Sequence, residues 1–132
     1  MSTLSDPEVK KLLTDPNYAV VSTLNEDGSI LSTIVWVSAD DDNAYVNSAM
    51  GRQWPTNLQR DPHVTVLVYE DGNPYHFVSI RGTATASTDG ADEHINALAK
   101  KYIDKDEYPF RQPGEQRLKI DITPDHIRHV KR

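Results

Sequence analysis

The segment HVTVLVYEDGNPYHFVSIRGTATA, residues 63–86, decides the fold class. Val64, Val66 and Val68 recur at every second position, which places them on one face of a strand. The turn residues Asp71-Gly72-Asn73-Pro74 follow, and then a longer stretch rich in β-branched side chains. The segment therefore predicts a long antiparallel hairpin with one buried face.

Further strands are expected on both sides of this hairpin. Each is a short run rich in Val, Ile, Thr or Tyr that turn residues bound, as at Asn25-Glu26-Asp27-Gly28. The expected strands cover residues 18–24, 30–38, 44–47, 63–69, 75–86 and 117–122, and an edge segment at 127–130 follows after Pro124 breaks the last strand. Five or six antiparallel strands in a continuous meander close most economically as a small barrel.

Three helices are expected to flank the strands. The first follows Ser5 and Glu8, which stand at the spacing of a capping box, and its apolar stripe is Val9, Leu12 and Leu13. The other two are expected at residues 55–60 and 92–103. The prediction is a mainly β, antiparallel β-barrel that forms one domain over residues 1–132. Because side chains fill the interior of so small a barrel, a sizeable ligand must lie outside it, often at a dimer interface.

The composition excludes several classes of protein and of site. The chain has 132 residues, 37% of them hydrophobic, and no cysteine, so disulfides, thiolate metal sites and cysteine catalysis are excluded. A formal net charge of −6 argues against general nucleic-acid binding, which needs a clustered basic face. No apolar run approaches the roughly 20 residues of a membrane span, and the N-terminus does not resemble a signal peptide. We therefore expect a cytoplasmic protein that binds neither nucleic acid nor membrane.

The common catalytic motifs are missing from the sequence. It contains no G-x-S-x-G elbow, no P-loop and no G-x-G-x-x-G. None of the five histidines stands in an H-E-x-x-H arrangement or at a spacing from a carboxylate that is typical of a metal site, so no metal is expected. His126 and His129 lie beside basic residues near the end of the chain and are expected on a solvated face.

The stretch most suggestive of a ligand site is SAMGRQWPTNLQRDP, residues 48–62. It leaves a strand, passes through Gly51 and enters a short helix. At such a junction, hydroxyl and backbone N–H groups together with Arg52 can hold an anion. The alternative is an ordinary strand-to-helix loop on which Arg52 is merely exposed.

Six short pieces of the sequence, taken in order, resemble one family. They are residues 18–24 with Asp27-Gly28, Val35-Trp36-Val37, the N-L-x-x-D-P-x-V element at 57–64, Arg81-Gly82-Thr83-Ala84, residues 108–111 and residues 122–127. Their order and spacing are similar to those of the pyridoxamine-phosphate-oxidase-like split-barrel superfamily. More narrowly, they resemble its branch of probable deazaflavin (coenzyme F-420)-dependent reductases.

This resemblance implies a split β-barrel that forms a homodimer with two equivalent cofactor sites at the interface. It implies an oxidoreductase that binds coenzyme F-420, or alternatively FMN, and passes hydride to an electron-poor small molecule. By position, Ser48, Arg52, Gln53 and Trp54 face the phosphate, Thr33, Ile34, Val35 and Trp36 line the ring, and Ala49, Asn57, Tyr75 and His76 are further cofactor contacts. No catalytic residue is implied, because a cofactor of this kind carries the chemistry.

The sequence departs from the family's pattern at two cations. Trp54 stands where the family often has a lysine, and Thr56 stands where it often has an arginine. Each lost charge-assisted bond weakens phosphate binding by about 1–3 kcal/mol. Alternative roles remain for four of the implied residues: Trp54 and Trp36 can pack in a core, and Tyr75 and His76 can be exposed strand positions.

Three other functions fit the same sequence. They are an FMN-dependent oxidase or reductase of this fold, a non-catalytic carrier of the cofactor, and an interaction module without a small ligand. For an F-420-dependent reductase, the acceptor can be an enone, a quinone or a tetrapyrrole, and the proton is expected to come from solvent.

Overall fold

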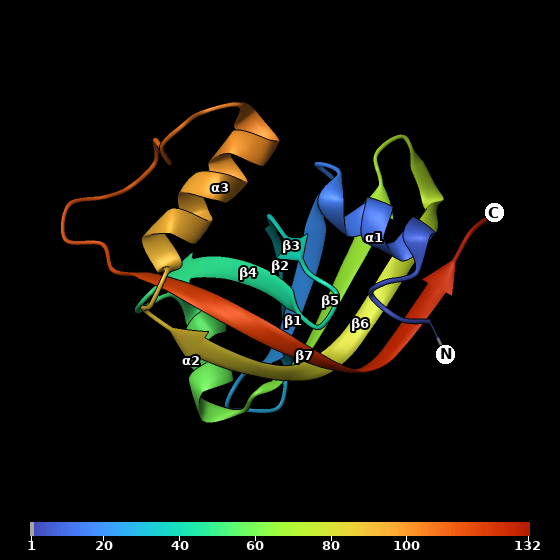
Figure 1. Ribbon diagram of the computed structural model, residues 1–132. Coiled ribbons are helices and arrows are strands. Elements are labelled where there is room, and N and C mark those ends of the chain that lie inside the picture. The colour runs from blue at the N-terminus through green and yellow to red at the C-terminus, as the bar shows by residue number, and fades with distance from the viewer. Residues whose placement is uncertain (1) are drawn as a thin grey trace.

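The computed structural model describes residues 2–132 and shows one sheet of seven antiparallel strands with three helices (Figure 1). The strands lie in the order β2-β1-β5-β6-β7-β4-β3. In chain order the elements are α1 (Pro7–Thr14), β1 (Ala19–Leu24), β2 (Ile30–Val35), β3 (Ser38–Ala39), β4 (Ala44–Ala49), α2 (Gln53–Arg60), β5 (His63–Glu70), β6 (Asn73–Ser87), α3 (Ala91–Ile103) and β7 (Arg117–Val130). The predicted mainly β, antiparallel architecture is confirmed.

One bent segment forms both edges of the sheet. β2 pairs with β1 along its whole length, and β3 pairs with β4. Trp36 and Val37 alone separate β2 from β3, so the chain passes from one edge directly to the other and curls the sheet into a split barrel. The sequence predicted one unbroken strand at 30–38. The bend divides it in two, which is why the sheet has seven strands instead of five or six.

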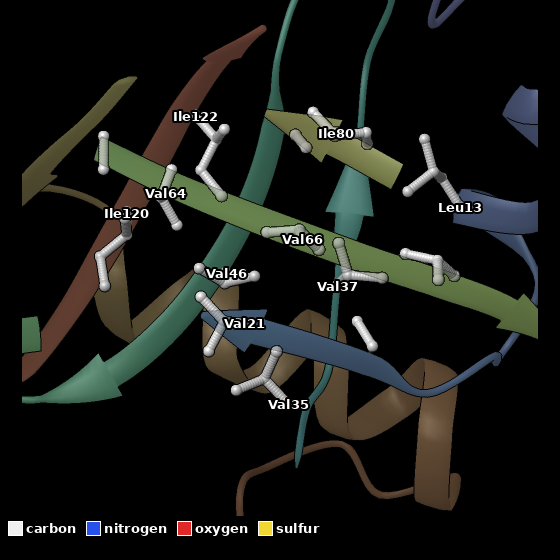
Figure 2. Close-up of a cluster of buried hydrophobic side chains, with 14 of the residues drawn as sticks. Leu13, Val21, Val35, Val37, Val46, Val64, Val66, Ile80, Ile120 and Ile122 are labelled. Atoms are coloured by element: carbon white, nitrogen blue, oxygen red, sulfur yellow. The ribbon is translucent and has the colours of Figure 1, made fainter. Parts of the chain in front are cut away.

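Aliphatic side chains from β1, β2 and β4–β7 fill the interior of the barrel (Figure 2). Val64, Val66 and Val68 face inward and are at most 3% exposed, as their alternation predicted. α1 adds Leu13 and its neighbours at the end where β1 begins. α2 adds Leu58 and the tryptophan one helical turn before it at the end where β1 finishes. The two helices therefore close opposite ends of one hydrophobic core.

α3 lies outside the barrel. Its buried residues Ile95, Leu98 and Ala99 do not belong to the core cluster, because the helix packs on the outer surface of β4 and β7. Figure 1 shows α3 (orange) beside β4, with the loop at 104–116 extending from the end of the helix back to the start of β7. This outer layer leaves room for a cavity between the helix and the barrel wall.

The starts of α1 and α2 differ from the sequence prediction. The N-cap of α1 is Asp6 instead of Ser5, and the carboxylate of Asp6 accepts hydrogen bonds from the backbone N–H and the hydroxyl of Thr3. Glu8 closes no capping box, because it accepts a hydrogen bond from Lys131 at the far end of the chain. α2 begins two residues before the predicted Pro55, which is compatible with proline because first-turn N–H groups have no intrahelical partner.

β7 continues through Pro124 instead of ending there. The pairing shifts register between Arg81 and Gly82, where Gly82 lies opposite Pro124 and Arg81 lies opposite His126. Proline donates no hydrogen bond to a ladder, and the irregularity lies at the point where Pro124 pairs. At Gly82 a Cβ atom would come within 2.9 Å of the carbonyl carbon of Thr123, so the two strands approach too closely for any side chain.

We predict that Gly82→Ala lowers the free energy of unfolding by about 3 kcal/mol or more, because the new methyl group meets backbone that cannot rotate away. Urea unfolding followed by circular dichroism measures the effect. Thr83→Ala, at the exposed neighbouring position, is the control and is expected to cost less than about 1 kcal/mol. A Gly82→Ala protein as stable as the unmodified one would contradict the close approach of β6 and β7.

Candidate functional site

A cavity of about 200 Å³ lies against the outer surface of the barrel. Its walls come from the segment before β1, the end of β2, the start of α2, the inner side of α3 and the loop before β7. The lining residues are Tyr18, Thr33, Ile34, Val35, Trp36, Asn47, Arg52, Trp54, Ile95, Leu98, Tyr108, Phe110 and Arg117. The cavity therefore stands where a sizeable ligand was expected, outside a filled barrel.

Trp36 forms an aromatic wall of this cavity. Its indole stacks on the ring of Tyr102 from α3, with centroids 5.3 Å apart and planes 7° apart. Tyr108 meets the same indole edge-on at 6.1 Å, and Phe110 meets Tyr108 edge-on at 5.7 Å. Trp36 is thus not part of the barrel core, and a flat apolar ligand can extend this aromatic cluster.

Two arginines face the cavity and share one carboxylate. Arg117 is only 3% exposed; its Nε donates to Asn47 Oδ1 at 3.0 Å, and its Nη1 donates to Glu115 Oε1 at 3.0 Å. Arg52, half exposed, donates through Nη2 to the same Glu115 oxygen at 3.1 Å. Burial lowers the pKa of Arg117. One carboxylate against two guanidinium groups leaves this side of the cavity positively charged.

His94 and Asn47 connect α3 to the barrel behind the cavity. His94 Nδ1 lies 3.1 Å from the Nδ2 of Asn47, and His94 Nε2 lies 2.9 Å from Ser38 Oγ. Because the amide nitrogen is the donor, Nδ1 must accept and Nε2 must carry the proton, which assigns a neutral imidazole. Burial lowers the pKa of His94 from its ordinary 6.5 to about 4, with a further contribution from nearby positive charges.

Lys101 and Tyr102 of α3 bind the backbone at the β2–β3 bend. Lys101 Nζ donates to the carbonyl oxygens of Val37 at 2.6 Å and Leu13 at 2.7 Å. The Tyr102 hydroxyl accepts from the N–H of Val37 at 3.1 Å and donates to the carbonyl of Asn17 at 2.5 Å. Burial lowers the pKa of Lys101 to about 8 and raises the pKa of Tyr102 to about 12. These bonds hold the bend, and with it Trp36, against the helix.

The structure brings half of the predicted cofactor contacts together at this cavity. Those that line it are Thr33, Ile34, Val35, Trp36, Arg52 and Trp54. Gln53 and Asn57 line a second concavity of about 720 Å³ between α2 and the turn after β1. Ser48 and Ala49 are buried in β4, and Tyr75 and His76 lie at the start of β6, away from both concavities.

Three of the predicted contacts are almost completely buried. Trp54 is 5% exposed and belongs to the core cluster, although it also lines the cavity. Asn57, 1% exposed, donates through Nδ2 to Thr23 Oγ1 at 3.1 Å and to Asn25 Oδ1 at 2.8 Å, so it ties α2 to the end of β1. Ser48 is fully buried, and its Oγ has no hydrogen-bond partner within residues 2–132.

Sequence reasoning missed the most buried cation of the cavity. Arg117 stands at the start of an alternating strand, where it reads as an outward-facing residue in line with Lys119 and Asp121. It is outward-facing with respect to the barrel, but α3 and the loop before β7 cover it. Its partner Asn47 lies 70 residues earlier and cannot be identified from the sequence, whereas Glu115 stands only two residues before Arg117.

The fold and the cavity define a split-barrel protein with an aromatic and cationic recess outside the barrel. The sequence profile of pyridoxamine 5'-phosphate oxidase matches residues 5–131, and the chain belongs to that family. No curated protein is significantly similar to the sequence. No helix within residues 2–132 combines the length and the apolarity needed to cross a membrane.

Solved structures of other proteins share the fold at low sequence identity. An F420 reductase is 23% identical, with 90% of this chain and 94% of that chain covered and a TM-score of 0.78. A putative pyridoxamine 5'-phosphate oxidase from Listeria innocua is 22% identical, with 96% and 97% covered and a TM-score of 0.70. HutZ, the heme storage protein from Vibrio cholerae, is 11% identical, with 95% and 94% covered and a TM-score of 0.69. These neighbours share a fold while their names point to different ligands.

The neutral His94 predicts a specific loss of stability in acid. Its pKa of about 4 lies below its ordinary 6.5, so between these values the unfolded chain binds more protons than the folded chain. The free energy of unfolding therefore falls as the pH drops from 6.5 towards 4, by about 3 kcal/mol from this group. Urea unfolding at several pH values measures it.

His94→Gln removes the titrating ring, so its free energy of unfolding should depend less steeply on pH in this range. His126→Gln, at an exposed position on β7, is the matched control and should keep the slope of the unmodified protein. Equal slopes for His94→Gln and the unmodified protein would show that His94 is not held neutral by burial.

Proposed function

We propose that the protein is an oxidoreductase that binds coenzyme F-420 in the cavity beside α3 and works as a homodimer. Members of its family typically bind a flavin, and an F420 reductase is among its structural neighbours. The observation that carries the proposal is the pairing of an aromatic wall, Trp36 with Tyr108, and a cationic wall, Arg52 with Arg117. The aromatic wall would hold the flat ring of a deazaflavin, and the cationic wall would hold its anionic tail.

The donor set at the cationic wall fits an anionic tail. Arg52 and Arg117 together leave one positive charge that Glu115 does not neutralise. Nε and Nη1 of Arg117 are both engaged, and its Nη2 has no hydrogen-bond partner within residues 2–132. Charge-assisted bonds from arginine to phosphate oxygens are among the stronger hydrogen bonds in proteins. Arg117 thus supplies a cation in a chain that lacks the family's positive charges at positions 54 and 56.

The size of the cavity supports a dimer. At about 200 Å³ it is smaller than the roughly 300–1,000 Å³ of typical small-molecule sites, so one chain encloses only part of a flavin-sized ligand. Tyr18, Ile34 and Phe110 stand at its rim with exposures of 48%, 70% and 58%. A second copy that covers these apolar side chains would complete the walls and exclude water.

The outer face of β1 and β2 is suited to this contact. Ile30 and Ile34 are each 70% exposed on β2, and they lie opposite Leu24 and Val20 of β1. An apolar surface of this kind, continuous with the rim of the cavity, is typical of a protein interface. The cofactor would then lie between the two chains.

The chain's own contribution is placement. When bound, a reduced deazaflavin supplies a hydride to an electron-poor acceptor such as an enone, a quinone or a tetrapyrrole. Trp36 holds the ring, the two arginines hold the tail, and the second copy keeps bulk water from the ring. The titratable residues that line the cavity are two arginines and two tyrosines, so the proton is assigned to solvent.

Parallel titrations with F-420, FMN and hemin test the proposal through quenching of tryptophan fluorescence, since both tryptophans line the cavity. We expect F-420 to bind most tightly. Arg52→Ala should raise the F-420 dissociation constant about tenfold or more, and Arg128→Ala, which replaces an exposed arginine elsewhere on β7, should leave it unchanged.

Ile34→Glu should both dissociate the dimer and abolish cofactor binding, whereas Thr85→Glu on the exposed side of β6 should do neither.

The other outcomes separate the alternatives. Tight FMN binding without F-420 binding would identify an FMN protein of the same fold, and hemin binding alone would identify a heme protein. F-420 binding without turnover of a quinone or enone would identify a carrier. If no cofactor binds, or if Ile34→Glu remains dimeric and binds normally, the proposed site is wrong.

A further inference from the structure

Three potential metal ligands from distant parts of the sequence meet beneath α1. Glu8 lies on α1, His76 lies near the start of β6, and His129 lies near the end of β7. Val78 pairs directly with His129, so His76, two residues earlier on β6, is its diagonal neighbour on the same face of the sheet. The histidine spacing in the sequence gave no sign of this cluster, because β-pairing alone creates it.

The two imidazoles stand at a separation that suits a shared ion. Their Nε2 atoms are 3.0 Å apart, and one potential ligand atom from each of Glu8, His76 and His129 lies within 4.8 Å of the others. A tetrahedral Zn²⁺ with Zn–N bonds of about 2.0–2.1 Å separates two nitrogen ligands by about 3.3 Å. The rings therefore need to move apart by only a few tenths of an ångström to hold an ion.

A further carboxylate orients the more buried histidine. His76 is 6% exposed, and its Nδ1 lies 3.3 Å from Glu70 Oε1. A proton on Nδ1 that points to Glu70 leaves the Nε2 lone pair free on the side of His129. Carboxylate–histidine–metal arrangements of this kind fix the tautomer and the ring of a metal-binding histidine.

A cavity that Glu8 and His76 line, and that His129 does not, leaves room for a water ligand on one side of the cluster, and Lys131 competes with an ion for Glu8. This cavity of about 120 Å³ is bounded by Glu8, Glu70, His76 and Lys131, among others, and a water occupies about 30 Å³ of liquid volume. Lys131 Nζ donates to Glu8 Oε1 at 2.6 Å, and both side chains are about half exposed. Either the second oxygen of Glu8 binds the ion, or the exposed Lys131 side chain turns away.

We propose that Glu8, His76 and His129 bind one Zn²⁺ per chain, with water in the fourth position. Imidazole nitrogen with carboxylate oxygen is a ligand set that Zn²⁺ accepts readily. The ion joins the first helix to the last strand. None of the three ligands lines the cavity beside α3, so the proposed metal site does not depend on the proposed cofactor site.

Isothermal titration calorimetry of the untagged protein with ZnCl₂ tests this site, because it measures both the stoichiometry and the dissociation constant. We expect one ion per chain with a micromolar or tighter dissociation constant. His129→Gln and Glu8→Gln should each weaken binding at least tenfold, because each removes one of three ligands. Their matched controls are His126→Gln, an exposed histidine on the same strand, and Glu26→Gln, an exposed glutamate in a turn, and both should bind Zn²⁺ as the unmodified protein does.

Glu70→Gln adds a finer test, because loss of a carboxylate that orients a metal-binding histidine typically costs 10–100-fold in affinity. Should a ligand variant fail to fold, the thermal unfolding of the unmodified protein decides: Zn²⁺ must raise Tm and EDTA must reverse the shift. No saturable binding, no shift in Tm, or affinities in His129→Gln and Glu8→Gln equal to those of the controls would overturn the proposal.

Discussion

The shape of the molecule depends on how α3 satisfies the backbone at Val37. The chain from residue 30 to residue 39 pairs with β1 at one end and with β4 at the other, so Val37 belongs to neither ladder. Its N–H donates to the Tyr102 hydroxyl and its carbonyl accepts from Lys101, which meets the requirement that buried backbone groups be paired. The same bend turns Val37 into the core and Trp36 outward to the cavity. The same bend therefore closes the barrel and forms the aromatic wall of the cavity.

The packing of α3 against the barrel buries three of its ionisable side chains, His94, Lys101 and Tyr102, and shifts the pKa of each. Lys101 is held where burial lowers its pKa to about 8, and His94 is held where burial lowers its pKa to about 4. Desolvation of such groups is costly unless each finds hydrogen-bond partners, and both do. The helix is thus fixed to the barrel by directed polar contacts as well as by Ile95, Leu98 and Ala99. Hydrogen bonds have preferred directions, so they fix the position of α3 on the barrel more closely than apolar packing alone.

The sequence predicted those parts of the structure that local pattern controls. Alternation at Val64, Val66 and Val68 correctly predicted a buried strand face, and the turn residues correctly placed the hairpins. The break at Trp36 and the passage of β7 through Pro124 were not predicted, because both depend on which strand lies alongside. The sites follow the same pattern. The family resemblance correctly pointed to residues of β2 that line the cavity. The roles of Arg117 and of the pair His76 and His129 depend on how the strands align, which the sequence does not show.

We propose that a flat, anionic cofactor binds against Trp36 beside α3. The chain contains two tryptophans, Trp36 and Trp54, so its ¹H–¹⁵N spectrum shows two indole signals that report on the cavity. Addition of F-420 to the labelled protein is the most direct measurement. We expect the Trp36 indole signal to shift most and the shift to saturate at one cofactor per chain. Binding that leaves both indole signals in place, while amide signals elsewhere on the barrel move, would contradict it.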